Sequence, residues 1–328
     1  MRLKSILLAL SMALSANGYA QAPIVIKFSH VTAVDTPKGR AAERFKVLVE
    51  KATNGRVSVE LYPNSQLYTS KNEIDALRKN EVQMLAPSLS EFGAMGVKEF
   101  EAFDLPYIFP NKGVLYDVTE GEIGKSVMKK LEPQGFVGLA FWDNGFKVMS
   151  ANKPLHTPAD FKGLKMRVQS SKAIQAQMKA LGASPVVTPL AEAFAALQSG
   201  AVDGTENPPS NMYTQKMNEV QKHVTLSNHG YLGYAVIVNK KFWDGLPLDI
   251  RGSLEKAMRE ATTFQKAIAQ RNNDVALEAI QKTGKTDIYT LTPKEQLEWR
   301  RVLTPVQKEM ESRVGKDLIS AINKEAGL

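Results

Sequence analysis

Residues 163–171, GLKMRVQSS, place Arg167 near the end of a segment in which apolar and polar side chains alternate. A guanidinium keeps its charge and matches a carboxylate with two parallel hydrogen bonds, so this residue type can bind an organic acid. The alternation puts Leu164, Met166 and Val168 on one face, which predicts a strand with one buried side, and the following serine pair can cap a helix. A charged residue on the other face is most often solvated. The segment alone therefore favours a solvent-facing arginine.

Three further polar residues lie where an α/β sheet binds ligands. The chain opens with a β-α-β-α-β rhythm, which predicts a mostly parallel sheet with helices on both faces, and ligands of such sheets bind beyond the carboxyl ends of the strands. His30 and Ser88 end two predicted strands, and Lys38 lies at the start of the first helix. The predicted strands are 24–30, 57–63 and 82–90, with helices at 36–55 and 70–81.

A second α/β run begins near residue 146, and a long helix follows it. Strands are predicted at 146–152, 164–169, 185–190 and 234–243, with helices at 170–182 and 190–204. Residues 248–282 contain no proline and almost no glycine, and as one helix they would be about 50 Å long. A helix of that length either packs on more than one lobe or breaks in the middle. We therefore expect two α/β lobes joined by crossing segments and backed by this helix.

Composition limits the location and the chemistry of the protein. The 328 residues are 43% hydrophobic and 23% charged, with a net charge of +8 and no cysteine, which excludes disulfides and thiol chemistry. Residues 1–20 have the basic start, apolar run and small closing residues of a secretory signal peptide, with cleavage predicted after Ala20. We expect an exported protein without a membrane span, and its basic residues do not form a nucleic-acid-binding motif.

Signatures of enzymes and metal sites are missing. The chain has no phosphate-binding glycine-lysine loop, no GxGxxG, no GxSxG and no HExxH, and its four histidines do not have metal-ligand spacing. We therefore predict no cofactor, no metal and no catalytic residue. The alternative from another class is a periplasmic hydrolase that uses Asp143 or Glu206 with a histidine. The aromatic run FDLPYIFP at 103–110 is interpreted as core, with a partner surface as the alternative.

Several motifs in order resemble one family. They are KFSHV and TPKG, LYPNSQL, FDLPYIF, NGFKVMSANKPL, LKMRVQSS, LQSGAVDGTEN and NHG. Together they are similar to the DctP-type solute receptors of tripartite ATP-independent periplasmic (TRAP) transporters, over nearly the whole chain after the signal peptide. The resemblance implies an α/β fold of two lobes with a ligand cleft between them, and a receptor that delivers an organic-acid anion to a membrane permease. It implies lobe I at 21–144 plus 233–272, lobe II at 145–232 plus 273–328, and a monomer.

The resemblance also implies roles for single residues. Arg167 matches the arginine that holds a substrate carboxylate in a bidentate salt bridge, and Asn207 matches an asparagine that donates to the same carboxylate. Lys147 and Lys38 are candidates for a second carboxylate. The alternatives are a solvated strand position for Lys147, a solvated helix start for Lys38 and an Asx-turn for Asn207. The remaining candidate ligand-binding residues are Ser88, His30, Gln169 and Asn211.

The ligand class stays open between two kinds of acid. Common dicarboxylate receptors carry Thr-Trp after the ligand asparagine, whereas this chain has Pro208 and Pro209. Loss of an aromatic side chain there can widen the pocket for a uronate or another sugar, hydroxy or oxo acid. The two lysines favour a second acidic group on the ligand, so a four-carbon dicarboxylate such as succinate, malate or fumarate is the leading expectation. A signalling receptor of the same fold is a further alternative.

Overall fold

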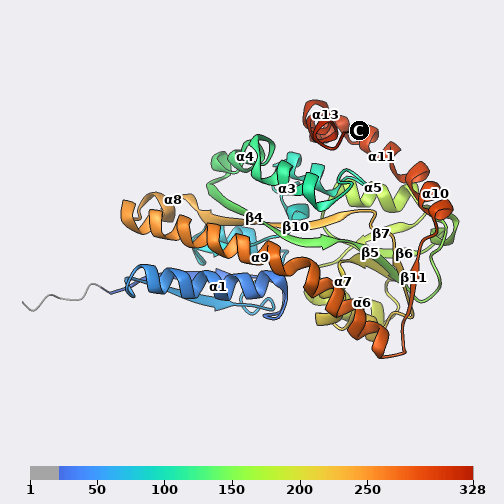
Figure 1. The fold of residues 1–328 in the computed structure, drawn as a ribbon, viewed down its shortest axis with the longest axis horizontal. Helices are drawn as coiled ribbons and strands as arrows, with labels where there is room; N and C mark the ends of the chain where they lie inside the picture. The colour runs from blue at the N-terminus through green and yellow to red at the C-terminus, as the bar shows by residue number, and fades with distance from the viewer. Residues whose placement is uncertain (1–21, 328) are drawn as a thin grey trace, which may run out of the picture.

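The computed structural model describes residues 22–327, so the predicted signal peptide and its cleavage site lie outside the described residues. Two separate sheets organise the chain (Figure 1). The first sheet has the strand order β2-β1-β3-β10-β4. Strands β1 and β2, and β1 and β3, are parallel, whereas β10 is antiparallel to both of its neighbours. The strands are β1 (Ile24–Ser29), β2 (Val57–Tyr62), β3 (Met84–Leu85), β4 (Phe136–Phe146) and β10 (Tyr231–Asn239).

The second sheet has the strand order β11-β9-β5-β8-β6-β7. Parallel pairs join β6 to β7 and to β8, and β5 is antiparallel to β8 and β9. The chain passes from one sheet to the other at Lys147, which separates β4 from β5. The strands are β5 (Val148–Ala151), β6 (Lys165–Val168), β7 (Ser184–Val187), β8 (Gly204–Asn207), β9 (His223–Leu226) and β11 (Asp287–Thr290).

Helices cover both faces of both sheets, as the sequence rhythm predicts. Each sheet separates two hydrophobic clusters, and helices supply the outer side of each cluster. The α/β architecture of two lobes is confirmed. The helices are α1 (Pro37–Ala52), α2 (Glu73–Arg78), α3 (Lys112–Glu120), α4 (Glu122–Lys129), α5 (Lys172–Ala180), α6 (Leu190–Gln198), α7 (Pro209–Thr214), α8 (Lys240–Asp244), α9 (Leu248–Lys282), α10 (Pro293–Leu303), α11 (Pro305–Glu309), α12 (Glu311–Val314) and α13 (Lys316–Glu325).

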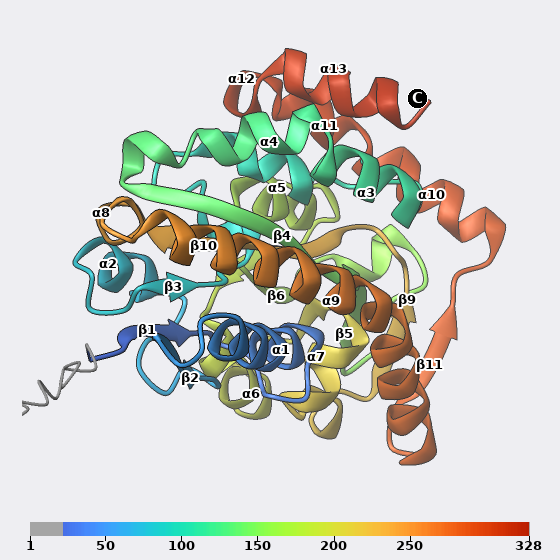
Figure 2. The ribbon, with the colours of Figure 1, turned by 60° about the vertical axis from the view of Figure 1, so that its left-hand side comes forward.

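The long helix α9 serves both lobes. Near its start, Leu254 and Met258 are buried in the cluster under the first sheet together with α1, whereas Ile280 near its end is buried in a cluster of the second sheet. Figures 1 and 2 show α9 beside α1 at one end and reaching the second sheet at the other. The prediction of one helix over 248–282 is confirmed, because no proline interrupts its hydrogen-bonded ladder.

The C-terminal helices differ from the predicted division into lobes. Trp299 of α10 is buried against the second sheet, as expected for 273–328. Val306, Met310 and Val314, however, are buried in the cluster of the first sheet, and α13 contacts α3 and α4. Helices α12 and α13 therefore pack on lobe I, where both contact the 3-10 helix η2 (Lys98–Asp104), whereas α11 contacts α5 of the second lobe. The other lobe boundaries remain a prediction.

Two local predictions also need correction. The strand predicted at 234–243 ends at Asn239, whose side chain accepts a hydrogen bond from Phe242 N and caps α8. Of the strand predicted at 82–90, only Met84 and Leu85 form a strand; Ser88 makes an isolated antiparallel bridge with Tyr234, and a short 3-10 helix η1 (Leu89–Glu91) follows. The aromatic run 103–110 is core, as predicted. None of the described helices has the length and mean hydropathy needed to cross a membrane.

Candidate functional site

A small cavity lies between the two lobes and is lined by both. The second lobe contributes Arg167, Gln169, Leu190, Asn207 and Asn211. A larger surface groove at the edge of the first sheet, lined by Lys79 and Lys241 among others, belongs to one lobe only. We select the inter-lobe cavity because it brings buried charged and polar groups from distant segments together. The first lobe contributes Val31, Thr32, Ser70, Glu73, Ser88, Glu91, Leu232 and Tyr234.

Arg167 is the cation of this cavity, and sheet pairing fixes its position. It lies in β6 between Val186 of β7 and Thr205 of β8, and only 2% of its surface is exposed. This burial excludes the solvent-facing position that the segment alone favours, whereas the ligand-binding role implied by the resemblance remains a prediction. Its Nε donates to Thr188 O at 2.8 Å, and among residues 22–327 the two terminal nitrogens make no hydrogen bond. Burial lowers the pKa of Arg167, while Glu206 and Glu91 oppose that change, and an arginine remains charged.

Two asparagines from the β8–α7 connection reach the same cavity. Asn207 ends β8, and Pro208 and Pro209 lead directly into α7, which carries Asn211. The Nδ2 of Asn211 lies 3.3 Å from Asn207 Oδ1 and 3.5 Å from the Tyr234 hydroxyl. The Oδ1 of Asn211 has no partner within the described chain. These amides offer donors and acceptors beside Arg167, and both side chains are at least 98% buried.

Ser88 and Gln169 line the cavity from different lobes. Ser88 caps η1 after β3 and lines the cavity from the first lobe, and Gln169 lines it from just beyond β6. Between them, Ser90 Oγ lies 3.5 Å from Gln169 Oε1 and donates to Asp104 Oδ1 at 2.7 Å. Polar groups of the two lobes therefore already meet at the edge of the cavity.

Lys38 and His30 lie behind the lining. The Nζ of Lys38 donates to Ala86 O at 3.0 Å and lies 3.8 Å from the centre of the Tyr234 ring. Lys38 is 0% exposed, so a solvated role is excluded, and burial lowers its pKa to about 7. His30 Nδ1 lies 3.4 Å from Thr32 Oγ1, and burial together with the Lys38 charge lowers the pKa of His30 to about 3. His30 is therefore neutral.

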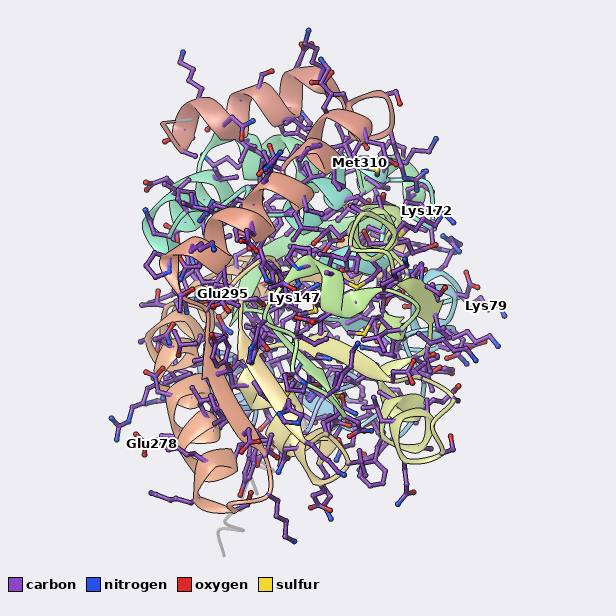
Figure 3. All side chains as sticks on the ribbon, turned by 90° about the vertical axis from the view of Figure 1, so that its right-hand side faces the viewer. Lys79, Lys147, Lys172, Glu278, Glu295 and Met310 are labelled. Carbon is purple, nitrogen blue, oxygen red and sulfur yellow. The ribbon has the colours of Figure 1, made fainter. Side chains whose placement is uncertain are left out.

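Lys147 is buried but has a carboxylate partner. Its Nζ lies 2.9 Å from Glu206 Oε2 and 3.0 Å from Oε1, and His229 Nε2 lies 3.5 Å from the same Oε2. Burial would raise the pKa of Glu206, but Lys147 and His229 outweigh it and hold that pKa below its usual value. Lys147 does not line the cavity. Lys147 is 1% exposed, and Figure 3 labels it near the centre of the view, whereas Lys79 and Glu278 lie near the edges.

The candidate hydrolase groups do not form a catalytic arrangement at the cavity. Asp143 Oδ2 accepts from Lys112 Nζ at 2.9 Å and from the Tyr116 hydroxyl at 2.8 Å, and neither Asp143 nor Glu206 lines the cavity. The histidine nearest Glu206 is His229, whose pKa is lowered by burial. In residues 22–327 no group of three metal-ligating side chains is close enough to hold a metal ion.

Sequence reasoning missed several lining residues, above all Glu73, Glu91 and Tyr234. Glu73 is the first residue of the short helix α2, whose polar sequence is typical of a helix on the surface. Its side chain is buried because α2 packs beside β3 and β10. Tyr234 lies within a fully buried strand, where an aromatic residue is usually core. Glu91 had a usable signal, since it lies only three residues beyond Ser88, at a strand end already selected as a ligand position.

Two α/β lobes with a charged cavity between them define the class of two-lobed solute-binding proteins. The chain belongs to the DctP family, bacterial extracellular solute-binding protein family 7, whose model matches residues 28–313. This is a family of receptors and not of enzymes. The chain is 61% identical over 314 residues to the C4-dicarboxylate-binding periplasmic protein DctP of Rhodobacter capsulatus, which covers 96% of this chain and 94% of that relative.

Solved structures agree with this family. A TRAP periplasmic solute-binding protein of Shewanella oneidensis with bound succinate has a TM-score of 0.91 and 42% identity, covering 93% of this chain and all of that chain (100%). A TRAP periplasmic solute-binding protein of Pseudomonas aeruginosa with bound L-malate has a TM-score of 0.86 and 41% identity, covering 88% of this chain and 100% of the other. The likeness extends over both lobes.

Proposed function

We propose that this protein is the periplasmic receptor of a TRAP transporter and that it captures a four-carbon dicarboxylate such as succinate, malate or fumarate. The relative from Rhodobacter capsulatus is named for C4-dicarboxylate binding, and the two structural neighbours hold succinate and L-malate. Export with removal of residues 1–20, a monomeric state and delivery to the membrane permease are parts of the same proposal.

One observation carries the proposal: Arg167 is a buried guanidinium whose terminal nitrogens are unused within residues 22–327. Glu206 and Glu91 act on this cation electrostatically but do not form an ion pair with it, and burying it is costly. A bidentate ligand carboxylate compensates that cost with two charge-assisted hydrogen bonds. Asn207 and Asn211 add neutral hydrogen-bonding groups next to the guanidinium. The second carboxylate would lie toward Ser88 and Tyr234 of the first lobe, with the Lys38 ammonium behind the tyrosine ring.

Contacts from both lobes explain how capture closes the receptor. A ligand held by Arg167 on one lobe and by Ser88 on the other makes all of its contacts only when the lobes are together. The ligand therefore favours the closed arrangement by the difference in contact energy between the open and closed states. The Ser90–Gln169 contact shows that the lobes approach closely at this edge.

A sugar acid is the second candidate ligand, because Pro208 and Pro209 stand where common dicarboxylate receptors carry Thr-Trp. The lining contains Val31, Leu190 and Leu232, which suit the methylene groups of a short dicarboxylate better than a chain of hydroxyl groups. This apolar lining favours the four-carbon acids.

Calorimetry with a panel of acids tests the proposed function. The full mature protein, freed of co-purified small molecules that mass spectrometry first identifies, is titrated with succinate, malate, fumarate, galactonate and galacturonate. We expect the three dicarboxylates to bind more tightly than the two sugar acids. Tighter binding of a sugar acid would show that the ligand class is sugar acids and not four-carbon dicarboxylates. Absence of binding to every acid would refute the receptor function. A neighbouring pair of permease genes would separate transport from signalling.

A further inference from the structure

The cavity holds two carboxylic acids that an anion-binding site does not obviously need. Glu73, the first residue of α2, is 1% exposed, and Glu91 lies at the end of η1. Both line the cavity together with Arg167. Ionised carboxylates here would repel the ligand's own carboxylates in a medium of low dielectric constant.

Glu73 is the stronger case because both of its oxygens are buried and unpartnered. Neither Oε1 nor Oε2 has a hydrogen-bond partner within residues 22–327. An ionised carboxylate in that position would lose its hydration without compensation, whereas a neutral acid loses much less. Glu91 is the weaker case, because burial favours its neutral form but the charge of Arg167 partly opposes that effect. The unpartnered Glu73 carboxyl therefore has a hydrogen bond to give to a ligand in the cavity.

The charged and titratable groups around Glu73 come from several elements. Lys38 approaches from α1, Glu91 from η1, and the Tyr234 phenol from β10, while His30, directly after β1, is neutral. Burial raises the pKa of Glu73 to about 8; Lys38 opposes this change and Glu91 adds to it. Burial likewise raises the pKa of Glu91 to about 7, against the attraction of Arg167.

Charge balance indicates which protonation state suits the ligand. With Arg167 and Lys38 charged and both glutamates ionised, the site is neutral, and a dianion would leave two uncompensated negative charges in a buried cavity. Protonation of Glu73 removes one of these negative charges and leaves the charge of Arg167 available to the ligand. A neutral Glu73 also becomes a hydrogen-bond donor, which a carboxylate ligand requires.

We propose that Glu73 is a ligand-recognition residue that acts as a neutral carboxylic acid, donating its O–H to a ligand carboxylate, so that the dicarboxylate is captured together with a proton. This inference rests on the proposed function. When Glu73 is already protonated before binding, its O–H bond stays intact. When it is ionised before binding, the proton that it gains comes from water. The expected signature is an affinity that falls as the pH rises through the pKa of Glu73.

Calorimetry of succinate binding to the full mature protein at about pH 7, 8 and 9 tests this assignment. Near pH 9 the Glu73 carboxyl of the ligand-free protein is largely ionised, so binding must take up a proton. Measuring the binding enthalpy in two buffers of different ionisation enthalpy reveals this uptake. Glu73→Gln keeps the size and the donor but cannot titrate. We expect the wild-type affinity to fall up to about tenfold more per pH unit than that of Glu73→Gln. Proton uptake near pH 9 should be larger by about one in the wild type.

The outcomes separate the assignment from its rivals. Lys38 can also gain a proton on binding. If the affinities of the wild type and Glu73→Gln depend equally on pH, and both proteins take up equal numbers of protons, the proton binds elsewhere and the assignment is overturned. A folded Glu73→Gln that no longer binds at pH 7 would show that the carboxyl acts as an anion, which also overturns it. Glu122→Gln, on the exposed start of α4, is the matched control and should behave as the wild type.

A second measurement needs no variant. Infrared difference spectra of the wild-type protein with ¹³C-labelled succinate near pH 8.5 should contain a protonated-carboxyl band that does not shift with the label. Absence of that band overturns the assignment even where Glu73→Gln does not fold. Failure of the proposed function looks different, because then the wild type binds no organic acid at any pH.

Discussion

Replacing Arg167 tests the group on which the proposed function depends. In Arg167→Ala the ligand loses two charge-assisted hydrogen bonds, each contributing about 1.5–3 kcal/mol. The sum, about 3–6 kcal/mol, corresponds to a loss of affinity of about 10²- to 10⁴-fold. Because the side chain is 2% exposed and lies between two strands, solvent does not screen this contribution appreciably.

Arg167→Lys separates charge from geometry. Lysine restores one positive charge but has a single nitrogen, which cannot both replace the Nε donor to Thr188 O and hold two carboxylate oxygens. We expect this variant to recover at most one of the two hydrogen bonds, which leaves its affinity about 10- to 100-fold below that of the wild type. Calorimetry with the best-binding acid of the panel measures both variants.

Lys165→Ala is the matched control for these variants. Lys165 lies two residues earlier in β6, but its side chain is exposed. The control should bind as the wild type does, and urea denaturation of all three variants shows whether each is folded. If Arg167→Ala binds with wild-type affinity while remaining folded, Arg167 does not hold the ligand and the site assignment fails.

Three further changes probe the support of the site. Lys147→Met removes the partner of buried Glu206 and should lower the free energy of unfolding by about 3–5 kcal/mol, as measured by urea denaturation. An unchanged free energy of unfolding would mean that the Lys147–Glu206 pair does not contribute to stability. Gly145→Ala should lower both stability and ligand affinity, because φ is +139° and an added Cβ would lie 2.6 Å from Asn273 Nδ2; a variant with wild-type melting and affinity contradicts this. His30 is buried with a pKa near 3, below the unfolded 6.5, so its contribution to stability is complete above pH 6.5 and is lost as pH falls toward about 3. Melting curves of His30→Asn should therefore depend less on pH over that interval than those of the wild type, and parallel pH profiles would argue against it.

Local patterns predicted most secondary structure because the forces that set it are local. The helix 248–282 follows from a long stretch without proline, and β6 follows from alternation of apolar side chains. Where local signals compete, the prediction failed: Asn239 caps a helix within what looked like one continuous strand. The serine cap predicted before α5 is present, since Ser171 accepts from Ile174 N.

The candidate site was only partly accessible to sequence reasoning. Arg167, Asn207, Asn211, Gln169 and Ser88 line one cavity, and most of these positions came from a family resemblance or from the rule about strand ends. Lys38, His30 and Lys147 lie behind that lining. Sequence could not show this, because the depth of a side chain depends on which segments pack over it.

The sequence by itself determined the alternation of strands and helices, the long α9, the α/β class and the type of ligand that an arginine at a strand end can hold. Tertiary structure alone decided which charges meet: Lys147 with Glu206, 59 positions apart, and Glu73 with the cavity of Arg167. It also decided that α12 and α13 return to the first lobe. Hydrogen bonding along one segment depends on neighbouring residues, whereas burial and charge pairing depend on the order of strands within the sheets, which brings distant segments together.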